Sequence, residues 1–190
     1  MKMLKKQLTL LLALLMLALV AAGCGSAPAK PEAKPETKPA AVSRIDQIKK
    51  NGKLILATGN YRPFEYHDEK TNKIIGYDID VAEAIAKKIG VPLEIKEMQF
   101  TGLIPSLQNG QVDLVIAAMY ITPARKEVVD FADPYMDTGM VLAVLKDNTT
   151  IKSTKDLDGK VVGVKTGATS EKVAQEMKEK GAKIEIKSYK

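Results

Sequence analysis

The sequence predicts an α/β fold built from two successive alternations of strands and helices. In the first, strands at residues 53–58, 93–98 and 112–119 alternate with helices at 78–89 and 103–109. Apolar residues recur at helical spacing in 78–89, whereas 112–119 is a nearly unbroken apolar run, typical of a strand buried on both faces of a parallel sheet. Strands that alternate with helices pair in parallel through right-handed crossovers. We therefore expect 112–119 to be the central strand of a parallel sheet.

A second alternation begins after residue 160. It is predicted as a strand at 161–164, a helix at 171–180 and a strand at 184–186. Between the two alternations, the apolar segment 139–145 predicts one more strand. Ligands of open parallel sheets bind beyond the carboxyl ends of the strands. We therefore expect functional residues in the loops that follow the strands.

The N-terminus predicts an export signal over residues 1–23. Three lysines precede the apolar run 8–20, and small residues then lead to Cys24, the only cysteine. The run is too short for a typical membrane span and suits the core of a signal peptide. The residues around Cys24 resemble a lipobox, which implies a diacylated cysteine at the start of the mature chain. The alternative is an ordinary export signal in which Cys24 is incidental.

The segment that follows predicts a tether. Residues 24–42 consist of the cysteine and a stretch rich in Pro, Ala, Lys and Glu without apolar periodicity. Such a segment stays extended, and at about 3.1 Å per residue it would reach roughly 50 Å. The remainder is long enough for one core or two small lobes. We expect a first lobe at 43–143 and a partial second lobe at 144–190.

Composition argues against several classes of function. The net charge is +6, but three lysines of the predicted signal peptide contribute half of it, and no basic stripe interleaves with aromatic residues. Nucleic-acid binding is therefore not expected. His67, the only histidine, lies in a hydrophilic turn that we expect to be exposed, so neither a Cys–His pair nor a zinc site is predicted. Asp78 and Asp80, at the start of a helix, are expected to complement its dipole. We predict neither an enzyme nor a cofactor.

The most informative residue is Arg125. It follows the apolar run 112–119, in the first turn of a helix that Thr122 can cap and Pro123 can begin. A cation there interacts unfavourably with the helix dipole. A bound anion at the same position would be attracted by both the cation and the helix N-terminus and would offset this cost. The sequence therefore predicts that Arg125 binds a carboxylate, with charge-assisted hydrogen bonds from its guanidinium.

Five segments together resemble the polar amino-acid family (family 3) of extracytoplasmic solute-binding proteins, the receptors of ABC importers. They are, in the order of the family, 54–66, 76–90, 98–113, 121–131 and 156–170. The resemblance implies a periplasmic-binding-protein-like (type II) fold, a monomer whose two lobes close about a hinge on a free amino acid and then engage permease subunits. Members of this family continue beyond the last predicted strand. The resemblance thus implies that the second lobe is incomplete in this chain.

The resemblance also implies eight ligand-binding residues. They are Tyr61, Phe100, Ala118, Tyr120, Thr122, Arg125, Lys165 and Thr169. The two aromatic rings, expected in loops, would enclose the ligand, backbone carbonyls of Ala118 and Tyr120 would accept from its ammonium group, and Arg125 would bind its carboxylate. Thr122 either binds the carboxylate too or only caps its helix. Thr169 would act from a loop that closes on the ligand, whereas Lys165, in the same loop, is alternatively a solvated lysine.

The ligand class follows from one departure from the family pattern. Relatives that prefer cationic or amide side chains often carry Asp at the turn after the first strand, where this chain has Gly59. This difference argues for a neutral polar amino acid. The family's acidic partner for the ammonium group is expected beyond Lys190. Two alternatives remain: a dehydratase of the same fold acting on prephenate- or arogenate-like acids, and a ligand-sensing module.

Overall fold

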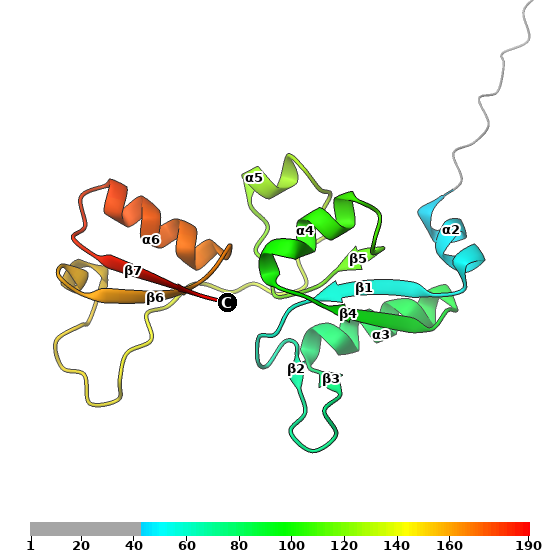
Figure 1. Ribbon diagram of the computed structural model, residues 1–190, viewed down its shortest axis with the longest axis horizontal. Helices are drawn as coiled ribbons and strands as arrows, with labels where there is room; N and C mark the ends of the chain where they lie inside the picture. The colour runs from blue at the N-terminus through cyan, green and yellow to red at the C-terminus, as the bar shows by residue number, and fades with distance from the viewer. Residues whose placement is uncertain (1–42) are drawn as a thin grey trace, which may run out of the picture. The chain divides into compact units, whose positions relative to one another are not determined.

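The first strand–helix alternation forms a three-stranded parallel sheet with a helix on each face (Figure 1). The structure is a computed structural model that describes residues 43–190. The predicted signal peptide, Cys24 and the tether lie outside the described residues. The sheet has the order β4-β1-β5, with β1 at Leu54–Thr58, β4 at Leu93–Glu97 and β5 at Leu114–Val115. The helices are α3, Tyr77–Ile89, and α4, Phe100–Gln108.

Alternating residues of β1 supply the two faces of the core, as the pleat of a strand requires. Leu56 packs with Ile79 and Ala82 of α3, whereas Ala57 packs with Leu103 of α4 on the opposite face. All four are at most 2% exposed. The sheet and both helices therefore form one core whose strand ends are held in a fixed arrangement.

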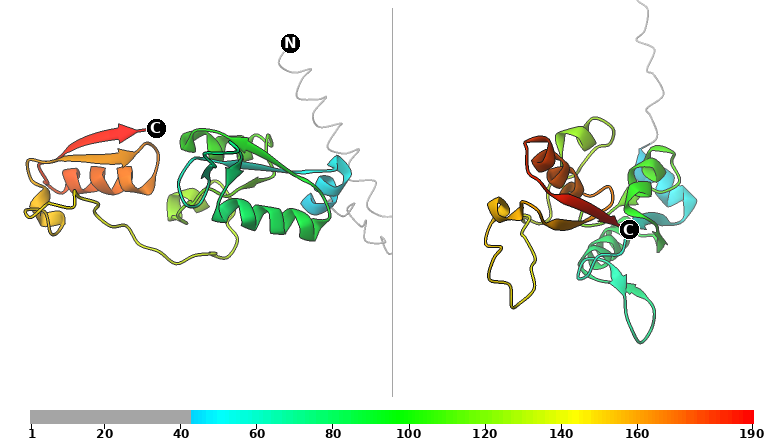
Figure 2. Two further views of the ribbon diagram at one scale, coloured as in Figure 1. Left: turned by 90° about the horizontal axis from the view of Figure 1, so that it is seen from below. Right: turned by 60° about the vertical axis from the view of Figure 1, so that its left-hand side comes forward.

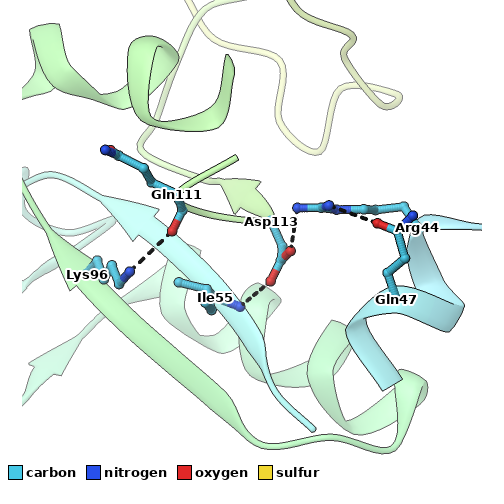
Figure 3. A network of polar contacts seen from close by, with 6 residues as sticks. All are labelled: Arg44, Gln47, Ile55, Lys96, Gln111 and Asp113. Carbon is cyan, nitrogen blue, oxygen red and sulfur yellow. Dashed lines mark hydrogen bonds and ion pairs between the residues drawn. The ribbon is translucent and has the colours of Figure 1, made fainter. Parts of the chain in front are cut away.

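A polar network fixes the register of β5 at its N-terminal end (Figure 3). Asp113, just before β5, accepts hydrogen bonds from the Ile55 N–H at 2.9 Å and from the Arg44 guanidinium at 2.8 Å. Arg44 begins helix α2, Arg44–Asn51. The carboxylate is 6% exposed, and both of its oxygens have a partner. Asp113 thus joins α2, β1 and β5.

Two predictions about strands were wrong. The run 112–119 forms only the two-residue strand β5, and β5 lies at an edge of the sheet, since β1 occupies the centre. Residues 139–145 form no strand, and Val141 and Leu145 are 89% and 80% exposed. A strand exists only where a neighbour pairs with it, and no segment within residues 43–190 pairs with 139–145. The apolar pattern alone does not supply that partner.

A short hairpin lies between β1 and α3. It consists of β2, Tyr66–His67, and β3, Ile74–Ile75. The chain then reaches α3 through Gly76, where a Cβ atom would lie 2.4 Å from the Phe64 carbonyl oxygen. Because φ at this position is also +129°, only glycine fits without strain. This close approach holds the turn at 59–65 against the start of α3.

The second alternation forms a smaller unit. Strands β6, Val161–Lys165, and β7, Glu185–Tyr189, pair in parallel, and α6, Thr169–Glu179, covers one face (Figures 1 and 2). Its buried residues are Leu157, Val164, Ala174 and Ile184. Two short helices precede it in the chain, α5 at Pro123–Lys126 and the 3-10 helix η1 at Thr154–Leu157. The predicted elements of this unit are therefore present, within a few residues of their expected ends.

Between residues 43 and 190, none of the helices combines the length and the apolar character that a membrane crossing demands.

Candidate functional site

Arg125 lies where the two strand–helix units meet. Its guanidinium donates from Nη1 to the Tyr120 carbonyl at 2.8 Å and to the Thr169 hydroxyl at 3.4 Å, and from Nη2 to the Gly167 carbonyl at 3.3 Å. The Phe100 ring lies 5.4 Å from the guanidinium carbon. The side chain is half-buried, and this burial lowers the pKa of Arg125. In residues 43–190 it forms no ion pair with a carboxylate.

The local sequence explains this position. The Thr122 hydroxyl accepts from the Arg125 N–H at 3.3 Å, and Pro123 occupies the first turn of α5, both as predicted. However, α5 has only four residues, so it cannot carry the dipole of a long helix. The predicted contribution of the helix dipole is therefore reduced. Attraction for an anion rests on the guanidinium itself.

Two aromatic rings and a lysine form the next part of the site. The Lys165 ammonium, at the end of β6, lies 5.3 Å from the centre of the Tyr61 ring and 5.2 Å from that of Phe100. It also donates to the Asn60 carbonyl at 3.4 Å. Cation–π contact with two rings is favourable for an ammonium group. Lys165 is thus directed at the aromatic pair, and it is only partly exposed. Phe100, expected in a loop, is instead the first residue of α4.

A small cavity lies beside this group, and a larger groove lies elsewhere. The cavity, about 160 Å³, is lined by Gln99, Phe100, Thr101, Lys165, Thr166 and Lys190. The groove, about 1160 Å³, follows the open edge of β5 and the segment 128–138; Ala118 and Tyr120 line it, whereas Arg125 and Lys165 do not. Size alone would select the groove. The polar groups that could hold a small ligand converge at the cavity and at Arg125.

The loop before α6 contributes Gly167 and Thr169. A Cβ atom on Gly167 would lie 2.6 Å from a methyl carbon of Thr101, and φ there is +74°. The Gly167 N–H donates to the Glu171 carboxylate at 2.7 Å, which fixes the loop and occupies that donor. Since α6 begins at Thr169, the N–H groups of Thr169 and Ser170 have no partner inside the helix, whereas those of Glu171 and Lys172 donate to the Ala168 carbonyl.

A buried carboxyl pair under the site was not predicted from the sequence. Asp78 and Glu65 are both 0% exposed, and the Asp78 carboxylate accepts from the Ala118 N–H at 2.6 Å. Asp78 was expected only to complement the dipole of its helix, so this long-range contact corrects that expectation. Burial, followed by the Asp78 charge, raises the pKa of Glu65 to about 8. Burial also raises the pKa of Asp78, and burial and the Asp78 charge raise that of the Tyr135 phenol.

His67 was expected in an exposed turn, but it lies in β2 and is partly buried. Its Nε2 lies 2.8 Å from a Glu97 oxygen, and this hydrogen bond raises the pKa of His67. No group of three His, Cys, Asp or Glu residues suited to a metal ion occurs within 43–190.

The eight predicted ligand residues therefore occupy one region. Lys165 contacts both Tyr61 and Phe100, and Arg125 contacts Phe100, Tyr120 and Thr169. Thr122 caps α5, and Ala118 is held by Asp78. The Tyr120 carbonyl, predicted to accept from a ligand, here accepts from Arg125. Contact of any of these residues with a ligand remains a prediction.

Two strand–helix units that meet at an arginine, with no acidic partner for it among residues 43–190, define an α/β ligand-binding protein of the periplasmic-binding-protein type. Residues 54–188 match the model of the bacterial extracellular solute-binding proteins, family 3. The chain belongs to this family, as the sequence resemblance predicted.

The chain is similar to known amino-acid-binding proteins, one of them a curated relative and two of them solved structures. The chain is 43% identical over 126 residues to the arginine-binding extracellular protein ArtP of Bacillus subtilis (strain 168), covering 66% of this chain and 48% of ArtP. The crystal structure of the ancestral amino acid-binding protein AncCDT-1, a precursor of cyclohexadienyl dehydratase, matches with a TM-score of 0.72 and 43% identity over 77% of this chain and 65% of that one. An ancestral arginine-binding protein bound to glutamine matches with a TM-score of 0.67 and 47% identity, over 73% and 60% of the two chains. The chain spans about half the length of the curated relatives it matches.

Proposed function

We propose that this protein is an extracytoplasmic receptor that binds a free amino acid at Arg125 and delivers it to an ABC importer. Arg125 is the observation that carries the proposal. It is a half-buried cation held by two carbonyls and a hydroxyl, without a carboxylate partner in the described part of the chain. Burying an unpaired charge is costly, and a ligand carboxylate would offset that cost with charge-assisted hydrogen bonds.

Both strand–helix units would contribute residues to the binding of the ligand carboxylate. Arg125 follows the sheet of the first unit, whereas Thr169 and Gly167 belong to the second, and all three are joined by hydrogen bonds. A carboxylate that displaced these contacts would bind groups from both units at once. Ligand binding would in this way be coupled to closure of the units about the segment that joins them.

We propose that the ligand has a neutral polar side chain. The Lys165 ammonium lies between Tyr61 and Phe100, so a cationic side chain placed against these rings would meet a like charge. Gly59 supplies no carboxylate there. Glu65, whose oxygen would lie 3.4 Å from a Cβ on Gly59, is mostly uncharged at neutral pH because its pKa is about 8. An amide or hydroxyl side chain would suit this surrounding better than a guanidinium.

The N-terminal residues complete the proposal. Acylation of Cys24 and a tether over 25–42 would hold the binding unit near the membrane that carries the permease. Two acyl chains give stable anchoring where one does not. In this proposal the protein acts as a monomer, and its partners are the amino acid, the permease subunits and the membrane.

Thermal unfolding of the protein with each of the twenty amino acids at millimolar concentration tests the proposal. A ligand that binds the folded state stabilises it by RT ln(1 + [L]/Kd), about 2.7 kcal/mol at 100 Kd, so weak binding is also detected. We expect L-glutamine or another neutral polar amino acid to raise Tm more than L-arginine does. In the Lys165→Met variant, we expect the preference over L-arginine to shrink about tenfold. Preference for L-arginine in the unchanged protein would contradict the ligand class. No shift with any amino acid, both in this chain and in one extended by the rest of the family's second lobe, would contradict the function.

The dehydratase alternative has one observation in its favour. Glu65 is a carboxyl group that is protonated at neutral pH, which is the state that an acid catalyst of dehydration needs. However, its side chain is fully buried, and the neighbour with the largest effect on its pKa is Asp78. Incubation with prephenate, followed by absorbance of an aromatic product, separates the two functions. We expect no product.

A further inference from the structure

Asp78 links the first turn of α3 to the segment that follows β5. Its Oδ2 atom accepts the Ala118 N–H at 2.6 Å across 40 residues of sequence. The side chain is fully buried and forms no ion pair with any described cation. A buried carboxylate without a cationic partner is costly, so it is retained only where it contributes something that a neutral residue would not.

Ala118 is in a conformation that alanine seldom adopts. Its φ is +45°, and only it and Asn72 among the described non-glycine residues have positive φ. The left-handed region is strained for an L-residue other than glycine, and it persists only where the surroundings enforce it. Two hydrogen bonds do so here: Asp78 holds the Ala118 N–H, and the Thr58 hydroxyl donates to the Ile116 carbonyl at 2.7 Å.

The conformation of Ala118 determines where the chain goes next. Two residues later, the Tyr120 carbonyl accepts from the Arg125 guanidinium at 2.8 Å. Asp78 is therefore connected to Arg125 through Ala118 and Tyr120. An extended Ala118 would send the chain straight on from β5 and would move that carbonyl away from the guanidinium.

We propose that Asp78 is a positioning residue for ligand binding: its buried carboxylate holds Ala118 in the left-handed conformation that directs Tyr120 and Arg125 toward the ligand. This inference rests on the proposed function. Glu65 and Tyr135 face the same carboxylate, and Lys165 acts on Glu65 from β6. The Ala118 N–H makes the regular hydrogen bond to Asp78, at 2.6 Å, while Glu65 and the Tyr135 phenol lie close enough to the same carboxylate to shift its pKa.

A set of four variants tests the inference. Asp78→Ala removes the acceptor, and Asp78→Asn keeps an acceptor of similar shape without the charge. Ala118→Gly removes the cost of positive φ, so glycine reaches the left-handed region without help from Asp78. Asp113→Asn is the matched control, because Asp113 also accepts a backbone N–H in the sheet but lies at its other end. The probes are L-glutamine and L-arginine, measured by calorimetry on the full chain.

We expect Asp78→Ala to weaken binding of the better probe by at least about tenfold, the equivalent of one lost buried hydrogen bond. Asp78→Asn should fall between Asp78→Ala and the unchanged protein. Adding Ala118→Gly to Asp78→Ala should restore most of the affinity, which a purely structural role of Asp78 would not allow. Asp113→Asn should lower stability while leaving affinity within about twofold.

Hydrogen exchange of the Ala118 amide gives a readout without ligand. It should be slow in the unchanged protein and in Asp78→Asn, and at least about tenfold faster in Asp78→Ala. If Asp78→Ala leaves that exchange rate unchanged, or weakens binding without rescue by glycine, the inference is overturned. If neither probe binds the unchanged protein but Asp78→Ala still speeds the hydrogen exchange of the Ala118 amide, the proposed function is contradicted, whereas the claim that Asp78 fixes the conformation of Ala118 is supported. If Asp78→Ala does not fold, the same decision is made on Asp78→Asn with and without Ala118→Gly.

Discussion

Asp113 and Asp78 are two buried aspartates that accept a backbone N–H at opposite ends of β5. Asp113 precedes the strand, binds the Ile55 N–H at 2.9 Å and pairs with Arg44. Asp78 binds the Ala118 N–H beyond the strand at 2.6 Å, and its neighbours are a second carboxyl group and a phenol. The buried carboxylate of Asp113 thus has a cationic partner, whereas the buried carboxylate of Asp78 has none among the described residues.

This contrast separates a structural end of the sheet, at Asp113, from the end at which we propose that the ligand binds. Figure 3 shows that both oxygens of Asp113 have a partner and that one of these partners is the cation Arg44. Such a carboxylate stabilises one arrangement of the strands. At the carboxyl ends of the strands, Arg125 forms no ion pair with a described carboxylate, and Asp78 forms none with a described cation. Arg125 and Asp78, two charged groups without an oppositely charged partner in the described chain, therefore lie at the end of the sheet where parallel sheets bind their ligands.

The largest effect should come from the two arginines that represent these ends. We expect Arg125→Ala to lower affinity for an amino acid at least about 100-fold, because two charge-assisted hydrogen bonds to the carboxylate are lost. Its effect on the free energy of unfolding should be small, since the side chain forms no ion pair with a described carboxylate. Arg44→Ala is the control, and it should leave affinity unchanged. Equal loss of affinity in both variants would remove the distinction between the two ends.

A smaller effect is expected at Asp113. Asp113→Ala leaves the Ile55 N–H without its acceptor, which should cost about 1–3 kcal/mol of unfolding free energy, measured with urea. Affinity should not change, because the contacts of Asp113 lie at the far end of β1 and β5. Arg44→Ala should cost less, about 0–1 kcal/mol, because its side chain is 53% exposed. A drop in affinity for Asp113→Ala that exceeds its loss of stability would count against a scaffold role.

A further prediction concerns pH. The pKa of Glu65 rises from 4.5 to about 8 on folding, so the folded state binds more protons between these values, and stability should fall as pH rises through that window. Glu65→Gln should flatten this fall. His67, whose pKa is also raised from 6.5 by Glu97, adds a fall in the same direction at higher pH, so the range from 4.5 to 6.5 is diagnostic. Urea unfolding across this range should show a shallower slope for Glu65→Gln, and an identical slope would mean that Glu65 is ionised in the folded protein.

The sequence predicted the elements whose apolar periodicity is long. The helix expected at 78–89 is α3, Tyr77–Ile89, and the strand expected at 53–58 is β1, Leu54–Thr58. It missed the hairpin β2–β3, because strands of two residues show no period. Residues 139–145 were wrongly predicted as a strand, because an apolar pattern indicates that a segment can form a strand but not whether another strand is available to pair with it.

Of the site, the sequence anticipated the groups that local rules define. Thr122 caps α5 with Pro123 in its first turn, and Arg125 follows as expected. Asp78 was misjudged because an acid at a helix start has a sufficient local explanation. Its contact with Ala118 depends on how α3 crosses to the end of β5, which no local pattern encodes. Glu65 was missed for the same reason, since its burial arises from the close approach at Gly76.

The exposed segment 139–145 has a practical consequence for anyone who handles this protein. An extended apolar stretch with free backbone groups offers a template to which identical stretches of other molecules can add, and self-association of this kind grows with concentration. Acidic and basic residues flank the stretch, namely Asp137, Lys146 and Asp147, and such charges oppose stacking in register. Salt weakens that opposition, so dilute, low-salt buffers should keep the protein dispersed.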